Sequence, residues 1–378
     1  VTLQARLKKL GLLEEVGGLA YLAEIADFVP TSHNAEYYAE LIANAASARA
    51  LIDVGAEMIR AGYDPGVEPR ERLNQAEAQM FKIFDGRSSR GPQAFNDVLI
   101  EALAEIDRRT EMQGVAGLKT GFAPLDLATG GLREMELTVL AARPSAGKSA
   151  LAGNIAEHVA IEQRKTVLFV SLEMSQIELG ERMLCSRARI NSRDCKNGTL
   201  TELERRQLMA ASNELCSGCL HIDAAPSRNM TEIASIARRM KRQQQLALVI
   251  VDYLQLVEPE NPKDIREQQV AQISKRLKRL AREVRVPILC LAQLNRESEK
   301  AEEPQLRHLR ESGSIEQDAD NVWMLHQLDE GRPPEEGQRT FRAKLFLRKQ
   351  RGGEKTAILL NWSPIWTLFE ATEMQTEF

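Results

Sequence analysis

The stretch Leu137-Thr-Val-Leu-Ala-Ala-Arg-Pro-Ser-Ala-Gly-Lys-Ser149 decides the fold of this chain. Its first six residues form an apolar run of strand length, and a helical pattern begins near Ala150. A strand, a loop ending in Gly-Lys-Ser and a helix together make a phosphate-binding loop, whose backbone N–H groups surround the phosphates of a nucleotide. The expected nucleotide-binding residues of this loop are Arg143, Pro144, Ser145, Ala146, Gly147, Lys148, Ser149 and Ala150.

Within this loop, Lys148 is expected to reach the β- and γ-phosphates and Ser149 to ligand a magnesium ion. The first glycine of the strict motif is replaced by Ala142, whereas Gly147-Lys148-Ser149 is intact. We therefore expect ATP and Mg²⁺ as the cofactors of this chain.

Further apolar runs of strand length alternate with helical patterns after residue 114. They cover 137–142, 166–171, 246–252, 287–291 and 322–325. This alternation predicts an α/β fold with a mostly parallel sheet covered by helices on both faces. The runs 341–348, 356–361 and 365–369 are separated only by turns, so they predict antiparallel strands at the edge of that sheet.

Three regions are expected along the chain. Residues 1–86 show helical periodicity, with Leu41, Ala45, Ala48, Ile52, Gly55 and Ile59 predicted to form one buried face. Residues 87–113 are expected to be a linker, because glycine, serine and proline are frequent from 85 to 92 and a short apolar-striped helix follows from Phe95 to about Arg109. Residues 114–378 are predicted to be the nucleotide-hydrolysing domain.

Three polar residues stand at the ends of predicted strands. Asp252 ends the run Leu-Ala-Leu-Val-Ile-Val and is expected to hold magnesium, with a turn-capping carboxylate as the alternative. The residue after it is Tyr253, so the base that activates water must come from elsewhere. Glu173 is the candidate for that base. Gln293 could sense the γ-phosphate or simply form a turn.

Composition limits the classes of function. The 378 residues carry a formal net charge of −4, so nucleic-acid binding must depend on local basic groups. No apolar run is long enough for a membrane span, and the five scattered cysteines suit a reducing cytoplasm. Cys216 and Cys219 form a CxxC pair, which we interpret as structural thiols rather than as half of a zinc site.

The phosphate-binding loop, Glu173, Asp252-Tyr-Leu-Gln255 and Ala292-Gln-Leu-Asn-Arg296 follow one another in the order typical of replicative DNA helicases. Together with Leu309-Arg-Glu-Ser-Gly-Ser-Ile-Glu-Gln-Asp-Ala-Asp320, the most specific stretch, they resemble the DnaB family. The resemblance runs from Leu12-Leu-Glu-Glu-Val-Gly-Gly18, through Val29-Pro-Thr31 and Glu36-Tyr-Tyr38, to Lys349-Gln-Arg-Gly352. We expect the chain to lack only the opening part of the family's N-terminal helical domain, which contacts primase.

The resemblance implies a RecA-like core in a homohexameric ring, with ATP between subunits and single-stranded DNA in the central channel. It makes Arg351 an arginine finger that reaches the neighbour's nucleotide, with Lys349 and Gln350 beside it, and brings Arg182 close to the nucleotide. It further implies 5′ to 3′ unwinding at the cytoplasmic replication fork, a primase partner and a helicase loader. Without the resemblance, residues 348–353 would be interpreted as a solvated basic hairpin tip.

For DNA, the resemblance singles out Arg310, Glu311 and Gly313, where glycine would allow a close backbone approach to phosphate. The preceding loop 297–303 is acidic, although such loops are often more basic in the family. The helix from Val270 to Val284 carries Lys275, Lys278, Arg279, Arg282 and Arg285 opposite an apolar side. This basic side is either a phosphate track or, as is more usual, a solvated face.

Two other functions remain open at this point. One is a recombinase or clock-type ATPase on the same core, although such proteins lack the helical domain and the Arg-Glu-Ser-Gly loop. The other is a non-enzymatic ring scaffold that recruits primase, which the intact Lys148, Ser149, Asp252 and Glu173 argue against.

Overall fold

The structure is a computed structural model of the chain. It describes residues 7, 12–22, 35–63, 72, 76, 94–111, 115–295, 298, 301–309, 313–328 and 340–372. The chain divides into two compact units, Val1–Phe95 and Asn96–Phe378. None of the described helices combines the length and the apolar composition that a membrane crossing needs.

The first unit contains α3 (Ala35–Tyr63), an alanine-rich helix in the region where helical periodicity was predicted. The predicted burial of its apolar face is wrong for this chain, because Ile52 and Ile59 are 70% and 65% exposed. No described residue of the chain packs over these two side chains. A helix can therefore form from local propensity while its apolar stripe stays uncovered.

The helix predicted within the linker 87–113 is present as α5 (Phe95–Glu111). Its apolar side chains are also uncovered, with Phe95, Leu99 and Ile106 exposed by 72%, 44% and 54%.

The second unit is built on one nine-stranded sheet with the order β3-β2-β4-β5-β1-β6-β7-β8-β9. The strands are β1 (Leu137–Ala142), β2 (Val167–Ser171), β3 (Leu220–Asp223), β4 (Leu248–Asp252), β5 (Ile288–Gln293), β6 (Asn321–Gln327), β7 (Phe341–Gln350), β8 (Ala357–Ser363) and β9 (Leu368–Ala371). Neighbours from β3 to β6 pair in parallel, and β6 to β9 pair antiparallel. The predicted mostly parallel sheet with antiparallel edge strands is confirmed.

No strand was predicted at the position of β3. This strand has only four residues, Leu-His-Ile-Asp, and lies at the outer edge of the sheet with none of its residues fully buried. A short, half-exposed edge strand lacks the continuous apolar run by which the central parallel strands were recognised.

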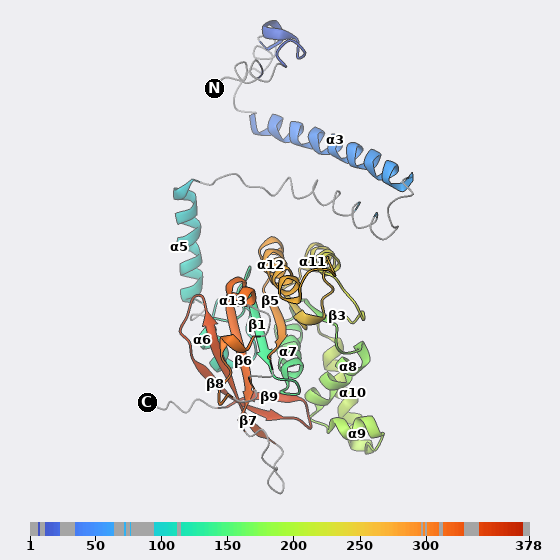
Figure 1. Ribbon diagram of the computed structural model, residues 1–378, viewed down its shortest axis with the longest axis vertical. Coiled ribbons are helices and arrows are strands. Elements are labelled where there is room, and N and C mark those ends of the chain that lie inside the picture. The colour runs from blue at the N-terminus through green and yellow to red at the C-terminus, as the bar shows by residue number, and fades with distance from the viewer. Residues whose placement is uncertain are drawn as a thin grey trace. The chain divides into compact units, whose positions relative to one another are not determined.

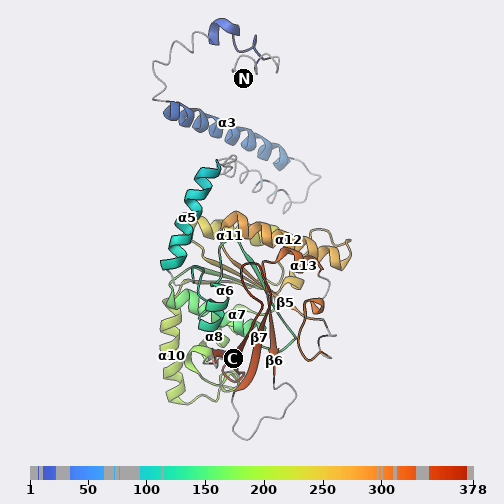
Figure 2. The ribbon, with the colours of Figure 1, turned by 90° about the vertical axis from the view of Figure 1, so that its left-hand side faces the viewer.

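Helices cover the sheet on both faces (Figures 1 and 2). On one face, α11 (Met230–Gln244), α12 (Arg266–Val284) and α13 (Gly313–Asp318) share a buried core with the strands. On the other, α6 (Ala123–Thr129), α7 (Lys148–Glu157) and α8 (Gln176–Ala188) pack over a second core. The remaining helical segments are the π-helical turn His158–Glu162, α9 (Ser192–Asn197), α10 (Glu202–Cys216) and the 3₁₀ turns Leu254–Leu256 and Leu306–His308.

Candidate nucleotide-binding site

Four strand ends meet at one edge of the sheet. The parallel pairings place Ser171 beside Asp252 and Ala142 beside Gln293, at the last residues of β2, β4, β1 and β5. The N–H of Leu172 donates to the Asp252 carbonyl oxygen at 2.7 Å, which extends the pairing one residue beyond β2. This carboxyl edge is where ligands bind in open parallel sheets.

The phosphate-binding loop leaves β1 and turns into α7 at Gly147, the N-cap residue of that helix. Gly147 has φ 89°, and no side chain caps the helix, so the N–H groups of the first turn are left for a ligand. A Cβ at this position would lie 2.9 Å from the Phe369 ring and 3.3 Å from the Trp362 ring. These two rings stack with centroids 4.2 Å apart, so they form a rigid support on which only glycine fits.

Lys148, the first residue of α7, lies between two residues of the β4 edge. Its Nζ is 3.7 Å from Oδ1 of Asp252 and 4.1 Å from the centroid of the Tyr253 ring. Burial lowers the pKa of Lys148, and the negative charges of Asp252 and Glu173 oppose this shift. The structure therefore brings together the predicted phosphate-binding lysine and the predicted magnesium carboxylate.

Asp252 is fully buried, and neither of its carboxylate oxygens accepts a hydrogen bond from the described residues. Buried carboxylates without donors are costly unless a cation compensates them, and Lys148 alone is beyond hydrogen-bond distance. No group of three His, Cys, Asp or Glu side chains in the described residues could hold a metal. Mg²⁺ needs only one or two protein oxygens when phosphates and waters complete its shell. Ser149 and Asp252 thus fit the predicted ion.

Glu173 lies just beyond β2, two residues after Ser171 at the same sheet edge, and its side chain is exposed. It is close enough to act electrostatically on Lys148 and on Tyr253. Burial raises the pKa of Tyr253, and the neighbouring carboxylates Glu173 and Asp252 raise it further. A carboxylate that is exposed at the phosphate edge is in a position to meet an attacking water.

Gln293 ends β5 and is joined to the β4 edge by Gln255. The side chain of Gln255 accepts from the Gln293 N–H and donates to its carbonyl oxygen, both at 3.3 Å. Arg266 of α12 in turn donates to the Gln255 carbonyl oxygen. Because Gln255 follows Asp252 by three residues, this double hydrogen bond links the strand carrying the predicted metal ligand to the strand carrying the predicted sensor.

Arg351 lies at the opposite edge of the sheet, just past the end of β7. Its guanidinium donates to Oδ1 of Asp320 at 3.0 Å, although the Arg351 side chain is 74% exposed. Asp320 also accepts from the N–H of Leu137, the first residue of β1, at 2.8 Å. The phosphate-binding loop follows the last residue of β1, so the two edges are separated by roughly 17 Å at ~3.3 Å per strand residue.

The companions of Arg351 are also held within the chain. Lys349 donates to the Glu316 carbonyl oxygen in α13 at 2.5 Å, and Gln350 donates to the Ala128 carbonyl oxygen at 2.7 Å. The structure therefore places Lys349, Gln350 and Arg351 together, away from the phosphate-binding loop of their own chain.

Arg182 stands on α8, where the hydroxyl of Thr367 donates to its carbonyl oxygen at 3.1 Å. No described contact joins its side chain to the phosphate-binding loop, and its nucleotide role stays a prediction. Of the predicted DNA-binding residues, Arg310 and Glu311 lie outside the described residues, and Gly313 is the first residue of α13.

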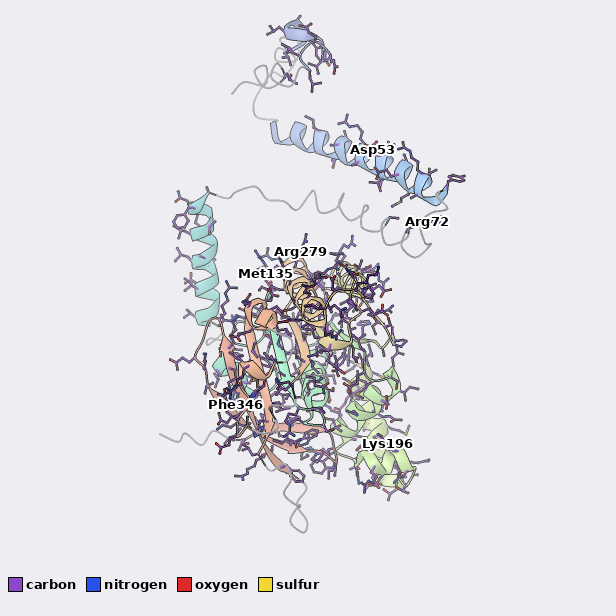
Figure 3. All side chains as sticks on the ribbon, in the orientation of Figure 1. Asp53, Arg72, Met135, Lys196, Arg279 and Phe346 are labelled. Atoms are coloured by element: carbon purple, nitrogen blue, oxygen red, sulfur yellow. The ribbon has the colours of Figure 1, made fainter. Side chains whose placement is uncertain are left out.

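The basic side of α12 contains one paired and four exposed side chains. Lys278 is paired within the chain, because its Nζ is 2.5 Å from Oδ2 of Asp320 and 2.9 Å from the Met135 carbonyl oxygen. The other basic side chains of the predicted track, Lys275, Arg279, Arg282 and Arg285, are exposed. Arg279 is labelled on this helix in Figure 3.

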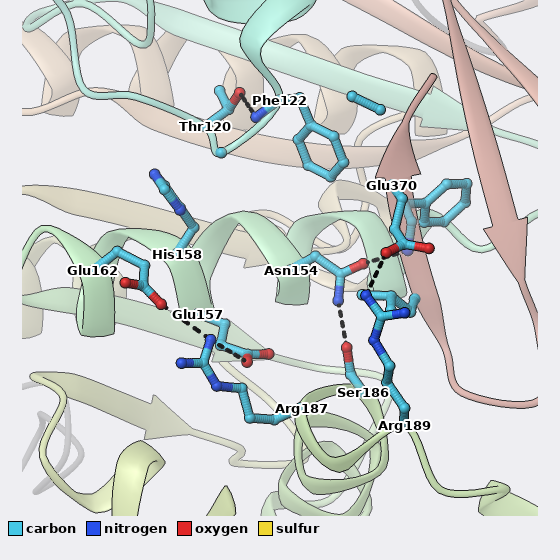
Figure 4. A pocket seen from close by; sticks show the side chains of 14 residues that line it. Thr120, Phe122, Asn154, Glu157, His158, Glu162, Ser186, Arg187, Arg189 and Glu370 are labelled. Carbon is cyan, nitrogen blue, oxygen red and sulfur yellow. Dashed lines mark hydrogen bonds and ion pairs between the residues drawn. The ribbon is translucent and has the colours of Figure 1, made fainter. Parts of the chain in front are cut away.

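A cavity of about 400 Å³ lies at the far end of α7 from the phosphate-binding loop. Asn154 spans one side of it, donating to Ser186 of α8 at 3.0 Å and accepting from the N–H of Phe369 at 2.9 Å (Figure 4). The cavity contains none of the predicted site residues. Beside this cavity, the hydrogen bond from the Phe369 N–H to Asn154 joins β9 to α7.

Sequence reasoning missed three parts of this arrangement. No role was predicted for Asp320, and its position two residues before the predicted strand 322–325 was the available signal. For Gln255, the available signal was its position three residues after Asp252, the last residue of a predicted strand. Trp362 and Phe369 lie on strands that are distant in sequence from Gly147, so no local pattern could have placed their rings against it.

The sheet order and the strand-end residues define the second unit as a RecA-like ATPase domain. The family model of the DnaB-like helicase C terminal domain matches residues 117–371, and that of the DnaB-like helicase N terminal domain matches residues 1–44. The chain therefore belongs to the DnaB-like replicative helicases, a family of ATP-hydrolysing DNA helicases.

Individual relatives agree with this assignment. The chain is 37% identical to the replicative DNA helicase DnaC of Bacillus subtilis, over 93% of this chain and 78% of that protein. It is 36% identical to the replicative DNA helicase DnaB of Geobacillus stearothermophilus over the same shares. A solved structure of a DnaB-like replicative helicase, described with its interactions with primase, has a TM-score of 0.70 at 27% identity, covering 99% of this chain and 88% of that one.

Proposed function

We propose that this chain hydrolyses ATP at sites completed by a second copy, and uses the energy to move 5′ to 3′ along single-stranded DNA inside a homohexameric ring. Lys148, Ser149, Asp252 and Glu173 would belong to one subunit, and Arg351 would come from the next. The observation that carries this proposal is the position of Arg351 at the sheet edge opposite its own phosphate-binding loop.

Within one subunit, each group has a separate task. The N–H groups of the loop and Lys148 hold the phosphates, and Glu173 accepts a proton from the attacking water. Bound Mg²⁺, held by Ser149 and through water by Asp252, would neutralise charge on the phosphates. Gln293 would sense the γ-phosphate, and the Gln255 hydrogen bonds would tie that response to the Asp252 strand.

The neighbour would supply Arg351 as a finger, with Lys349 and Gln350 beside it. Such a residue is typically worth about 10³–10⁵ in rate, because it stabilises the charge of the transition state. The 74% exposure of the Arg351 side chain leaves most of the guanidinium available to a second copy. We extend the same proposal to Arg182 as a further nucleotide contact.

The remaining assignments concern DNA and protein partners. The backbone at Gly313, with Arg310 and Glu311, would contact DNA phosphates without reading sequence, so binding should weaken with salt. The N-terminal unit would contact primase, and the solved relative is described with its interactions with primase. A helicase loader, and action at the replication fork in the cytoplasm, complete the proposal.

Mixed rings provide the test. Lys148→Ala removes the phosphate-binding lysine and Arg351→Ala removes the proposed finger, so each pure variant should lose DNA-stimulated ATP hydrolysis and forked-duplex unwinding. A 1:1 mixture should regain hydrolysis at up to about a quarter of its sites, because a subunit with intact Lys148 can adjoin one with intact Arg351 in a head-to-tail ring.

The matched control is a mixture of Lys148→Ala with Lys148→Ala/Arg351→Ala subunits, in which no interface carries both groups. Recovery in the first mixture but not in the second supports a shared site. If neither mixture recovers while both form rings of normal mass with single-stranded DNA, the arginine does not act between subunits.

A further inference from the structure

Two thiols meet between α8 and α9. The Sγ atoms of Cys185 and Cys195 are 3.3 Å apart, and both cysteines are free. Cys185 is buried, whereas Cys195 is partly exposed. The CxxC residues Cys216 and Cys219 make no comparable contact with each other in the described structure, although only two residues separate them.

The backbone holds this pair in place. The chain leaves α8 through Arg189 in the left-handed region, with φ 53°, and enters α9 through Asn191, whose side chain caps the new helix. The N–H of Ile190 donates back to the Cys185 carbonyl oxygen at 3.1 Å. The closeness of the two sulfurs therefore follows from a hydrogen-bonded turn between two short helices.

A small cavity opens beside the thiols. It is lined by residues of both helices, including Arg182, Ser192 and Lys196 with the two cysteines, and has an accessible volume of about 10 Å³. A space of this size admits one water-sized molecule. Lys196, which neighbours Cys195 in α9, is labelled at the periphery of the unit in Figure 3.

We infer that Cys185 and Cys195 are a modification site, at which hydrogen peroxide converts the two thiols into a reversible disulfide that joins α8 to α9. The sulfurs need to approach from 3.3 Å to about 2.05 Å for this bond to form.

The chemistry begins at the more exposed sulfur. The Cys195 thiolate attacks one peroxide oxygen, the O–O bond breaks, and the departing hydroxide takes a proton to become water, leaving a sulfenic acid. The Cys185 sulfur then attacks the Cys195 sulfur, the S–O bond breaks, and the departing hydroxide combines with the Cys185 proton as a second water. Two thiols are thereby oxidised by two electrons, and one peroxide is reduced to two waters.

The order of the two steps follows from the environment of the thiols. Burial raises the pKa of the Cys185 thiol to about 12, and its contact with Cys195 adds to the shift. A thiol with so high a pKa is a poor first nucleophile, because the thiolate is the reactive form. Cys185 therefore serves as the resolving cysteine.

The full chain can be tested without any substitution. After treatment with equimolar hydrogen peroxide and alkylation of the remaining thiols, trypsin cuts at Arg182, Arg187, Arg193 and Lys196 and separates the two cysteines. We expect peptide 183–187 linked to peptide 194–196, lighter than their sum by two hydrogens and released by dithiothreitol. Peptide 207–228 carries both Cys216 and Cys219 and serves as the internal control, so both of its thiols should be alkylated.

Two variants sharpen the result. Cys185→Ser should trap Cys195 as a sulfenic acid that reacts with dimedone, whereas Cys195→Ser should give neither dimedone labelling at Cys185 nor a linked peptide. The inference is overturned if the native chain yields no linked 185–195 peptide, or if Cys216 and Cys219 oxidise before this pair.

Discussion

Asp320 should be a principal electrostatic anchor of the ATPase unit, and Asp320→Asn removes its charge with little change of shape. The carboxylate is only 2% exposed and accepts from Lys278, Arg351 and the Leu137 N–H. The substitution leaves the ammonium of Lys278, itself 19% exposed, without its counter-charge. Breaking a buried pair from one side typically costs about 3–5 kcal/mol, and we expect about 3 because Lys278 keeps its bond to Met135.

The exposed part of the same network, Arg351, should contribute little to the free energy of unfolding. Arg351 is 74% exposed, so solvent screens its pair with Asp320, and Arg351→Ala should cost less than about 1 kcal/mol. Lys278→Met combined with Asp320→Asn should recover part of the loss, since removing both charges leaves neither one buried alone. A double-mutant cycle of these variants isolates the Lys278–Asp320 coupling.

The effect should depend on pH in a defined direction. Hydrogen bonds from Lys278, Leu137 and Arg351 outweigh the burial of Asp320 and hold its pKa below the ordinary 3.8. Because the folded-state pKa is depressed, the stabilisation is fully present above pH 3.8 and is lost as pH falls through the lower folded-state value. The deficit of Asp320→Asn should therefore be constant from pH 7 to about 5 and shrink towards pH 3.

Urea unfolding followed by tryptophan fluorescence measures this deficit. The three tryptophans, Trp323, Trp362 and Trp366, all lie in the ATPase unit, so the signal reports on that unit alone. A deficit below 1 kcal/mol at pH 7, or one that persists unchanged at pH 3, would refute the reasoning.

Two further predictions concern α7. Gly147→Ala should weaken nucleotide binding at least tenfold in calorimetry and destabilise the unit by about 1–3 kcal/mol, because the new Cβ would meet the Phe369 ring at a positive φ. The control is Gly180→Ala in α8, where a Cβ would have nothing within 4 Å. This substitution should instead stabilise the unit by about 1 kcal/mol. Glu157→Gln should exceed the wild type in stability at pH 8 by up to about 3 kcal/mol, since burial raises the pKa of Glu157 to about 7 from 4.5. This advantage should vanish as pH falls from 7 to 4.5, because the folded carboxyl is already protonated in that range while the carboxylate of the unfolded chain takes up its proton as the pH falls. A pH-independent difference would contradict it.

The central strands were predictable because parallel strands buried on both faces need continuous apolar runs. Leu137–Ala142 was predicted at its observed bounds, and every expected strand has a counterpart, although the one expected over 365–369 lies at Leu368–Ala371, after a turn. Local sequence also specifies the phosphate-binding loop, since Gly147 is the residue that its positive φ requires. The edge strand Leu220–Asp223 escaped prediction because partial burial does not demand such a run.

The contacts that organise the site could not be predicted in the same way. Asp320 meets Leu137 across 183 residues of chain, and Trp362 reaches Gly147 only after the sheet has formed. The apolar face of α3 was expected to be buried, yet periodicity records only that a face is apolar and not whether this chain covers it.

The hydrogen bond from the Phe369 N–H to Asn154 has a practical consequence for making a shorter protein. The last described strand, β9, braces the helix that begins at the phosphate-binding loop, so the segment from Pro364 to Ala371 is part of the catalytic unit rather than a removable tail. A fragment ending before Leu368 would lose the Phe369 ring that supports Gly147. The smallest self-contained ATPase therefore extends to Ala371, the residue at which the match to the C-terminal helicase domain also ends.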